Sequence, residues 1–440
     1  MKIAIFIIGL IYCLISLFTN NPTRKLIGFL GFVFVIQVGW IFYHYTGIFI
    51  YDFPILFLVL YGFFSGRKFK WYFKGLSLPA ILIIFWVLLT TTVAQNKGWT
   101  LGESSKILRG YLAFLAVANN VRTKKDVDIF LSSIFAGVLF ESLMGLWQWR
   151  IGATGLWFLN ENYNQWRATG TFYVPHFLGN YLIMILPVLI RLFIFYRAEN
   201  KRLTIFYGMG SALGILTLFV TFARGAWLGF IVSTGIMALF SLTFSRYRPR
   251  VKWAMAVSVF FAMIFVGHYL ATIQSQFGEE RKSAVDIRWV QYGVALRVIQ
   301  GLPVMGTGLG NYELGAPNFL TDYERSLPDA GQRTYMVHNS YLYFTAETGL
   351  VGGFLLLWGI FLLFRTGFRI VRSRSLYFSN ISIGLLTGHV AIAVAFLFGP
   401  DIHLEQFQVQ FGMSVGLLVA LRKIEVNYLK QQRKPSERAV

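Results

Sequence analysis

Residues 203–243 of the chain read LTIFYGMGSALGILTLFVTFARGAWLGFIVSTGIMALFSLT. Arg224 is the one charged residue in this stretch, and it separates two apolar runs, 203–222 and 225–243. Each run has about the 20 residues with which an α-helix crosses a hydrocarbon core about 30 Å thick. We therefore predict two transmembrane helices joined by a short turn at Arg224.

Similar apolar runs fill most of the 440 residues, of which 56% are hydrophobic and 13% charged. Soluble domains carry about 25% charged residues, so a soluble globular protein is excluded. The sequence predicts an all-α polytopic integral membrane protein with 12 or 13 transmembrane helices, forming a single membrane domain over 1–440. Two runs, 46–64 with Asp52 and Pro54 and 106–119 with Arg109, are alternatively half-spans. The predicted spans are 3–18, 26–43, 46–64, 77–94, 106–119, 127–148, 174–196, 203–222, 225–243, 251–270, 339–364, 378–398 and 404–421.

The formal net charge of +21 predicts the orientation of these spans. Lys and Arg in short loops remain on the cytoplasmic side, so the weakly charged segments between the basic loops are expected to face the outer side of the membrane. Because the basic residues are divided among short loops, they form no stripe for nucleic acid, and we expect no nucleic-acid partner. The side of the membrane on which the N-terminus lies stays open. The basic segments are 65–76, 120–126, 197–203, 244–252, 365–377 and the predicted cytoplasmic tail 422–440.

One of the predicted outer loops is long, covering 271–338 between the tenth and eleventh spans. Its acidic and basic residues nearly balance, and loops of this length are usually functional. Within it, apolar residues recur among polar ones over 283–300. That pattern predicts an amphipathic helix lying along the membrane surface, so we expect a long outer loop that carries short helices.

Three arginines on the predicted outer side, Arg167, Arg224 and Arg288, are candidates for anion binding. A guanidinium binds phosphate bidentately and stays ionised when partly desolvated, so converging arginines would hold a phosphate or pyrophosphate. Each has an alternative interpretation. Arg224 and Arg288 are also suited to contact lipid headgroups, and Arg167 to order its loop.

His338 lies where the long loop enters the eleventh span. A neutral imidazole facing an outer cavity is suited to take the proton from an attacking hydroxyl. The alternative is that His338 is a helix cap or an interface residue. His176, after Pro175, and His403, beside Asp401, are further candidates of the same kind.

Other kinds of site find little support in the sequence. Gly306-Thr-Gly-Leu-Gly310 has the glycine spacing of a phosphate loop, but no strand and helix flank it, so we interpret it as a turn. The six histidines are scattered, and we predict no metal site and no cofactor. The single cysteine, Cys13, excludes an intramolecular disulfide.

Taken together, Arg224-Gly-Ala-Trp-Leu228 and the spacing from His338 to Gly349 resemble the Arg-x3-Leu and His-x10-Gly elements of the O-antigen ligase and polymerase superfamily. These are bacterial polytopic membrane glycosyltransferases. Further matching elements are 167–172, 303–310 and 347–350, so the resemblance spans residues from about 50 to 420.

The resemblance implies a glycan donor linked through pyrophosphate to undecaprenol, and inverting transfer on the periplasmic face of the bacterial inner membrane without metal or nucleotide. Arg224 and Arg288 would stabilise the leaving pyrophosphate, with Arg167 and His176 completing the substrate-binding set. His338 would deprotonate the acceptor hydroxyl.

The alternative functions within this superfamily differ in the molecule that accepts the glycan. The two motifs favour a ligase that passes the glycan to lipid A core in lipopolysaccharide biosynthesis. A polymerase, which uses a second lipid-linked repeat unit as acceptor, is the main alternative. A transporter is the alternative from another class, although no internal repeat is visible and the candidate residues gather on one side.

Overall fold

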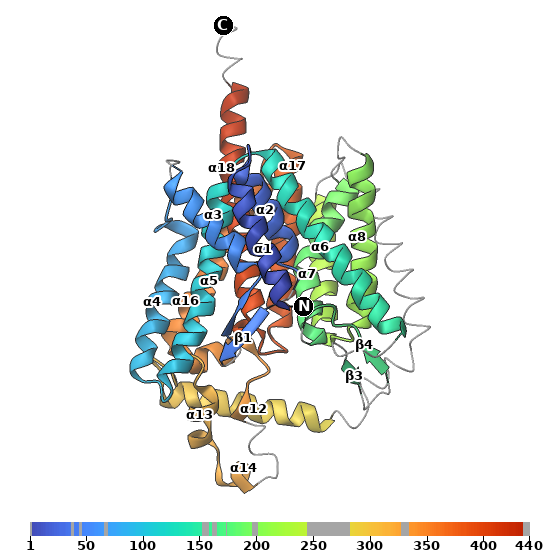
Figure 1. Cartoon of the computed structure of the whole chain (residues 1–440). Coiled ribbons are helices and arrows are strands. Elements are labelled where there is room, and N and C mark those ends of the chain that lie inside the picture. The colour runs from blue at the N-terminus through green and yellow to red at the C-terminus, as the bar shows by residue number, and fades with distance from the viewer. Residues whose placement is uncertain are drawn as a thin grey trace.

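The computed structural model describes residues 2–36, 39–43, 46–65, 69–151, 158–160, 165–172, 174–195, 201–243, 282–326 and 334–433. Most of these residues are helical, and two short antiparallel hairpins accompany the helices (Figure 1). In the first half of the chain the elements are α1 (Lys2–Leu17), α2 (Pro22–Val33), β1 (Gly39–Tyr43), β2 (Thr46–Phe49), α3 (Asp52–Phe64), η1 (Gly75–Ser77), α4 (Leu78–Leu89), η2 (Thr90–Thr92), α5 (Lys97–Asn120), α6 (Lys124–Ile151), β3 (Phe158–Asn160), β4 (Gln165–Arg167), α7 (Pro175–Phe195) and α8 (Lys201–Val220). In the second half they are α9 (Arg224–Thr243), α12 (Lys282–Gly301), α13 (Tyr312–Gly315), η6 (Ala316–Phe319), α14 (Asp322–Ser326), α16 (Ser340–Val371), α17 (Leu376–Ala395), η7 (Asp401–His403) and α18 (Glu405–Arg433).

Among the described residues, six helical segments are long and apolar enough to cross a membrane. This confirms a largely helical membrane protein with several spans, while the count of 12 or 13 and the periplasmic side of the long loop stay predictions. Three shorter apolar helices, α1, α3 and α9, accompany them. The six segments are Gly75–Thr92, Lys124–Ile151, Pro175–Phe193, Lys201–Val220, Ser340–Val371 and Leu376–Ala395.

Close backbone contacts hold α17 in the centre of the bundle between α7 and α9. A Cβ atom on Gly388 of α17 would collide with the carbonyl oxygen of Met184 in α7. On the other side, a Cβ atom on Gly229 of α9 would collide with the carbonyl oxygen of Ala391 in α17. Helices within a bilayer gain little from burying apolar surface against each other, so small residues that allow such close packing stabilise the bundle.

Helix α12 runs across one end of the bundle, and α13 and α14 lie beyond it (Figure 1). The last turns of α18 lie at the opposite end. Val294, Ala295 and Val298 form the fully buried face of α12 and pack against Tyr312 and Ala346. The predicted helix over 283–300 is thus confirmed, and its buried face holds it against the bundle.

Helix α16 is interrupted at Gly349, whose φ of 70° and ψ of −179° lie outside the helical region. Only glycine adopts this conformation readily. A Cβ atom there would also collide with the carbonyl oxygen of Val304. The turn that contains Val304 therefore packs directly on the backbone at the break.

The prediction of a span over 26–43 is wrong. Helix α2 ends at Val33, and Gly39–Tyr43 forms strand β1, which pairs with β2. Gly39 is paired with Phe49, and a Cβ atom at Gly39 would collide with the ring of Phe49, so the hairpin depends on this glycine. A short apolar run cannot be assigned to helix or strand from periodicity alone.

The two predicted half-spans behave differently. In 46–64 the helix begins only at Asp52 and has 13 residues, so it is a short helix, as the alternative predicted. In 106–119 the helix extends back to Lys97 and has 24 residues, but it is not one of the six segments apolar enough to cross a membrane, so both interpretations of this run stay predictions. The predicted span 251–270 and the loop residues 271–281 and 327–333 lie outside the described residues.

Candidate functional site

His338 directly precedes the N-cap of α16 and does not itself cap the helix. The side chain of Asn339 accepts hydrogen bonds from the backbone amides of Tyr341 (3.0 Å) and Leu342 (3.1 Å). Because Asn339 meets the capping requirement, the capping interpretation of His338 is wrong. The imidazole is left available for another role.

Helix α12 holds His338 through three contacts. Oε1 of Gln291 lies 2.9 Å from the ring nitrogen Nδ1 and 3.4 Å from the backbone nitrogen of His338. The hydroxyl of Tyr292 donates a hydrogen bond to the backbone carbonyl of His338 at 2.9 Å. Gln291 is only 2% exposed. The position and orientation of the imidazole therefore depend on α12.

The surroundings of His338 favour its neutral form. Burial, the charge of Arg288 and the charge of His176 lower its pKa to about 4, against the opposing attraction of Asp401. Arg288, on α12, and His176, at the start of α7, thus lie within electrostatic reach of the imidazole. Three of the five residues predicted for the site therefore lie together.

Asp401 links His176 to the turn after α17. Its carboxylate oxygens lie 3.4 Å from Nε2 of His176 and 2.7 Å from Nδ2 of Asn180. Asp401 is 2% exposed, and the same turn is bonded to Ser340, whose backbone amide donates to Phe396 at 2.8 Å. The loop 396–401 thus joins the start of α7 to the start of α16.

Arg224 is the first residue of α9, and the residue after it, Gly225, lies against the same loop. An ideal Cβ atom on the next residue, Gly225, would be 3.4 Å from Cβ of Phe398. Arg224 is half-buried. The elements that carry Arg224, His176 and His338 therefore meet around residues 396–401.

Arg167 orders the turn that precedes Arg224. Its guanidinium donates hydrogen bonds from Nε to the carbonyl of Thr221 (2.8 Å) and from Nη2 to that of Phe222 (3.0 Å). Phe222 has a φ of 50°, in the left-handed region. These contacts agree with the alternative interpretation, in which Arg167 holds its loop.

Glu141 is an isolated charge within the predicted span 127–148. From inside the bundle it holds the loop that contains Arg167. Its carboxylate accepts hydrogen bonds from the hydroxyl (2.6 Å) and the backbone amide (2.8 Å) of Thr171. Gln148, also on α6, accepts from the amide of Gly170 at 2.6 Å. A fully buried carboxylate is costly unless it is hydrogen-bonded, so Glu141 is explained by this structural role.

The glycine-rich turn 303–310 packs on the break in α16. The backbone amides of Thr307 and Gly308 donate to the carbonyls of Ala346 (3.1 Å) and Glu347 (2.9 Å). Both amides are thus occupied within the protein and are not directed at a ligand. The interpretation of this segment as a turn is confirmed, and its glycines allow the close approach to α16.

His403 lies between two carboxylates and differs sharply from His338. Nδ1 is 3.3 Å from Oε2 of Glu103, and Nε2 is 3.1 Å from Oε2 of Glu347. Burial opposes the charged ring, but Glu347 and Glu103 outweigh it and raise the pKa of His403 to about 9. Lys106 also pairs with Glu103, at 2.5 Å. His403 is therefore a cation at neutral pH and cannot serve as a base.

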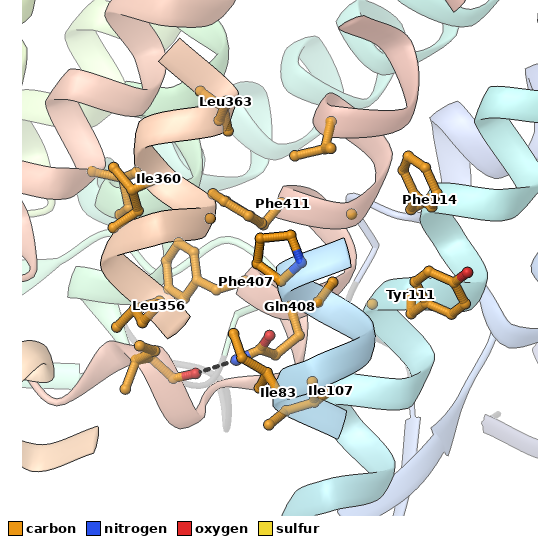
Figure 2. A pocket seen from close by; sticks show the side chains of 18 of the residues that line it. Ile83, Ile107, Tyr111, Phe114, Leu356, Ile360, Leu363, Phe407, Gln408 and Phe411 are labelled. Atoms are coloured by element: carbon orange, nitrogen blue, oxygen red, sulfur yellow. Dashed lines mark hydrogen bonds between the residues drawn. The ribbon is translucent and has the colours of Figure 1, made fainter. Parts of the chain in front are cut away.

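An apolar cavity of about 160 Å³ begins next to this end of the bundle. Tyr341, three residues after His338, and Ile402, next to Asp401, belong to its lining. The cavity then extends between helices α4, α5, α16 and α18. Figure 2 shows side chains from several of these helices around it: Ile83, Ile107, Tyr111, Phe114, Leu356, Ile360, Leu363, Phe407, Gln408 and Phe411.

Sequence reasoning missed Gln291 and the role of Asp401. One signal for Gln291 was present, because it lies three residues after Arg288 and so shares a face of the predicted helix. Asp401 was noted only as a neighbour of His403, and its contacts with His176 and Asn180 come from α7, more than 200 residues away.

Comparison with known protein families gives a match for part of the chain. Residues 209–357, about a third of the chain, match the family model described as O-Antigen ligase, and no curated protein matches the chain. The matching interval contains Arg224, Arg288 and His338, whereas Arg167 and His176 lie outside it. The match confirms the predicted resemblance to the O-antigen ligase and polymerase superfamily. It supports a membrane glycosyltransferase of that type.

Proposed function

We propose that this chain, whose residues 209–357 match the O-antigen ligase family, transfers a glycan from undecaprenyl pyrophosphate to a hydroxyl of lipid A core. The reaction would take place on the periplasmic face of the bacterial inner membrane, as a step of lipopolysaccharide biosynthesis. The predicted orientation supports this side, because the candidate residues lie on segments poor in Lys and Arg between the basic loops.

One observation carries the proposal: a histidine that stays neutral beside an arginine. His338 has a pKa of about 4 and lies within electrostatic reach of Arg288. A base must be deprotonated to accept a proton, and a pyrophosphate that leaves needs a cation. Together, His338 and Arg288 supply both requirements at one end of the bundle.

The proposed reaction proceeds by one displacement. Nε2 of His338 takes the proton of the acceptor hydroxyl while the hydroxyl oxygen attacks the anomeric carbon. The bond between that carbon and the pyrophosphate oxygen breaks, and the electron pair leaves with the lipid pyrophosphate. Arg224 and Arg288 stabilise the charge that develops there, and attack from the opposite face inverts the anomeric carbon.

Arg167 and His176 receive different roles within this proposal. Two hydrogen bonds of Arg167 hold the turn before Arg224, so Arg167 would act mainly by positioning Arg224. His176 is nearly half exposed and is paired with the buried Asp401, which leaves its ring at the surface of the site. There it would contact the glycan or the pyrophosphate.

The apolar cavity supports a donor that is anchored by a hydrocarbon chain. It begins next to the loop 396–401 and runs along the bundle between α4 and α18. Helix α4, on its outer side, is only slightly buried and leaves the cavity near the lipid. A prenyl chain in this cavity would bring its pyrophosphate to the end where the arginines lie.

Reconstitution of the purified protein in liposomes tests the proposal. The vesicles would contain a lipid-linked glycan donor and equal amounts of lipid A core and a second lipid-linked glycan as competing acceptors. Glycosylated lipid A core is the expected product. A lengthened lipid-linked glycan would instead identify a polymerase, and the absence of both products would overturn the proposed transfer and favour a transporter.

A further inference from the structure

We infer that Gln291 is a positioning residue, whose side-chain carbonyl oxygen keeps the proton of His338 on Nδ1 and leaves the lone pair of Nε2 for the acceptor hydroxyl. This inference rests on the proposed role of His338 as the base. It assigns a task to a buried residue of α12 whose side chain contacts His338.

The orientation of the Gln291 amide follows from the backbone. The oxygen and nitrogen of an amide are hard to distinguish, and their assignment depends on the hydrogen-bond network. Here the backbone N–H of His338 points at the same atom as Nδ1 does, at 3.4 Å. A backbone N–H only donates, so that atom must be the acceptor, the carbonyl oxygen Oε1.

The tautomer of His338 follows from that orientation. A carbonyl oxygen has no proton to give, so Nδ1, 2.9 Å away, must be the protonated ring nitrogen. The other tautomer would set two lone pairs against each other at this distance. In a neutral imidazole the second nitrogen is then an acceptor, and Nε2 forms no hydrogen bond within the described part of the chain.

An amide in this position also explains how the base remains neutral. In hydrolases with a catalytic triad, a carboxylate orients the histidine and stabilises the imidazolium. Gln291 orients the ring without adding a negative charge. The charged and titratable groups that face His338 are Arg288 and Tyr292 of α12, His176 of α7 and Asp401 of the loop after α17.

Helix α12 thereby connects the two halves of the proposed site. Arg288 and Gln291 are three residues apart and lie on one face of the helix. Val294, Ala295 and Val298 hold the next turns against the bundle. One rigid helix therefore carries both a proposed pyrophosphate ligand and the group that orients the base.

Two variants of Gln291 and one control test this role in the reconstituted full-length protein. Gln291→Leu keeps a similar volume but loses the acceptor, and we expect kcat to fall about 100-fold with little change in KM. Gln291→Glu restores an acceptor and adds charge, so we expect activity to return in part and the acidic limb of kcat/KM to move to higher pH. Gln300→Leu makes the same change at an exposed position of α12 and should match the wild type.

Equal kcat in wild type and Gln291→Leu would overturn the inference. So would equal losses in Gln291→Leu and Gln291→Glu with an unchanged pH profile, because a merely structural residue would behave in that way. ¹⁵N NMR of histidine-labelled protein, with His338→Asn to assign the signal, provides a readout independent of activity. A neutral His338 protonated on Nδ1 is expected, and protonation on Nε2 would contradict the inference. If the wild type transfers no glycan, the proposed function fails, while the spectrum still decides the tautomer.

Discussion

Nε2 of His403 lies 3.1 Å from Oε2 of the fully buried Glu347, and this contact separates two histidines that the sequence presents as alike. His403, held also by Glu103, has a pKa of about 9, whereas His338 has a pKa of about 4. Groups whose surroundings drive their pKa values apart have different tasks. His403 is a structural cation that joins η7 to α5 and α16, and His338 is the candidate base.

The pKa of His338 predicts an unusual pH profile for glycan transfer. Protonation removes the base, so kcat/KM should fall only as the pH decreases through about 4, and it should be flat between about pH 5.5 and 7.5. The pH dependence of kcat/KM reports the pKa values of the free enzyme, so binding of the pyrophosphate does not shift the pH at which kcat/KM falls. Initial rates in proteoliposomes at low donor concentration would measure it. An acidic limb centred near 6.5 that disappears in His338→Asn would contradict the account.

His403 predicts how the stability of the protein depends on pH. Its pKa is raised from 6.5 to about 9, so its contribution is complete below pH 6.5 and is lost as the pH rises through 9. The full contribution is about 3 kcal/mol of unfolding free energy. The thermal unfolding temperature of the wild type in detergent should therefore decrease between pH 7 and 10.

The variant His403→Gln should unfold at a lower temperature than the wild type at pH 7, because Glu347 loses its cation and Glu103 keeps only Lys106. The decrease with rising pH should also be smaller in this variant. An unfolding temperature that depends equally on pH in both proteins would show that His403 is not the group that titrates.

The break in α16 predicts a strong effect of Gly349→Ala. The backbone conformation at Gly349 is one that only glycine adopts readily, and the new Cβ atom would collide with the carbonyl oxygen of Val304. We expect a loss of about 3 kcal/mol or more of stability, with a lower unfolding temperature and less protein in the membrane.

Gly235→Ala is the matched control, since Gly235 lies on an exposed face of α9 and a Cβ atom there would meet nothing within 4 Å. This change should leave the unfolding temperature unchanged or raise it slightly. If Gly349→Ala behaved like Gly235→Ala, the proposed packing of the turn 303–310 on α16 would be wrong.

The proposed roles of Arg224 and Arg288 predict large losses of rate without loss of folding. Replacing either with alanine should lower kcat by about 100-fold to 1000-fold, since each would stabilise charge that develops on the pyrophosphate. Arg150→Ala removes an exposed arginine at the end of α6 and should retain wild-type rates. Transfer assays on variants with matched unfolding temperatures would measure this. Wild-type kcat in Arg224→Ala would remove Arg224 from the mechanism.

Much of the helical architecture could be predicted from the sequence, because apolar runs of membrane length are a strong signal. The runs 127–148, 203–222 and 378–398 all became long helices close to the predicted bounds. The span 26–43 was wrong because the hairpin of Gly39–Tyr43 forms by pairing with a later segment. An apolar run this short does not distinguish a helix from a local hairpin.

Residue type and position in the sequence were enough to select candidate residues for the site, but not to identify the residues that contact them. His338 and Arg288 were identified from residue type and position, and they lie within electrostatic reach of each other. Distinguishing His338 from His403 required Glu103, 300 residues away from His403 in the chain. The contact of Gln291 with His338 could not be predicted, because it depends on the approach of α12 to the start of α16. Contacts between distant segments, which decide charge and tautomer, are not visible in one sequence.

The central claim is that His338 is the neutral base of glycan transfer. Single-turnover transfer in proteoliposomes, started by adding acceptor to protein preloaded with lipid-linked donor, tests it most directly because product release is excluded. At neutral pH we predict that His338→Ala lowers the rate constant by at least about 100-fold while its unfolding temperature and donor binding match the wild type. A rate constant within a few-fold of the wild type would contradict the claim.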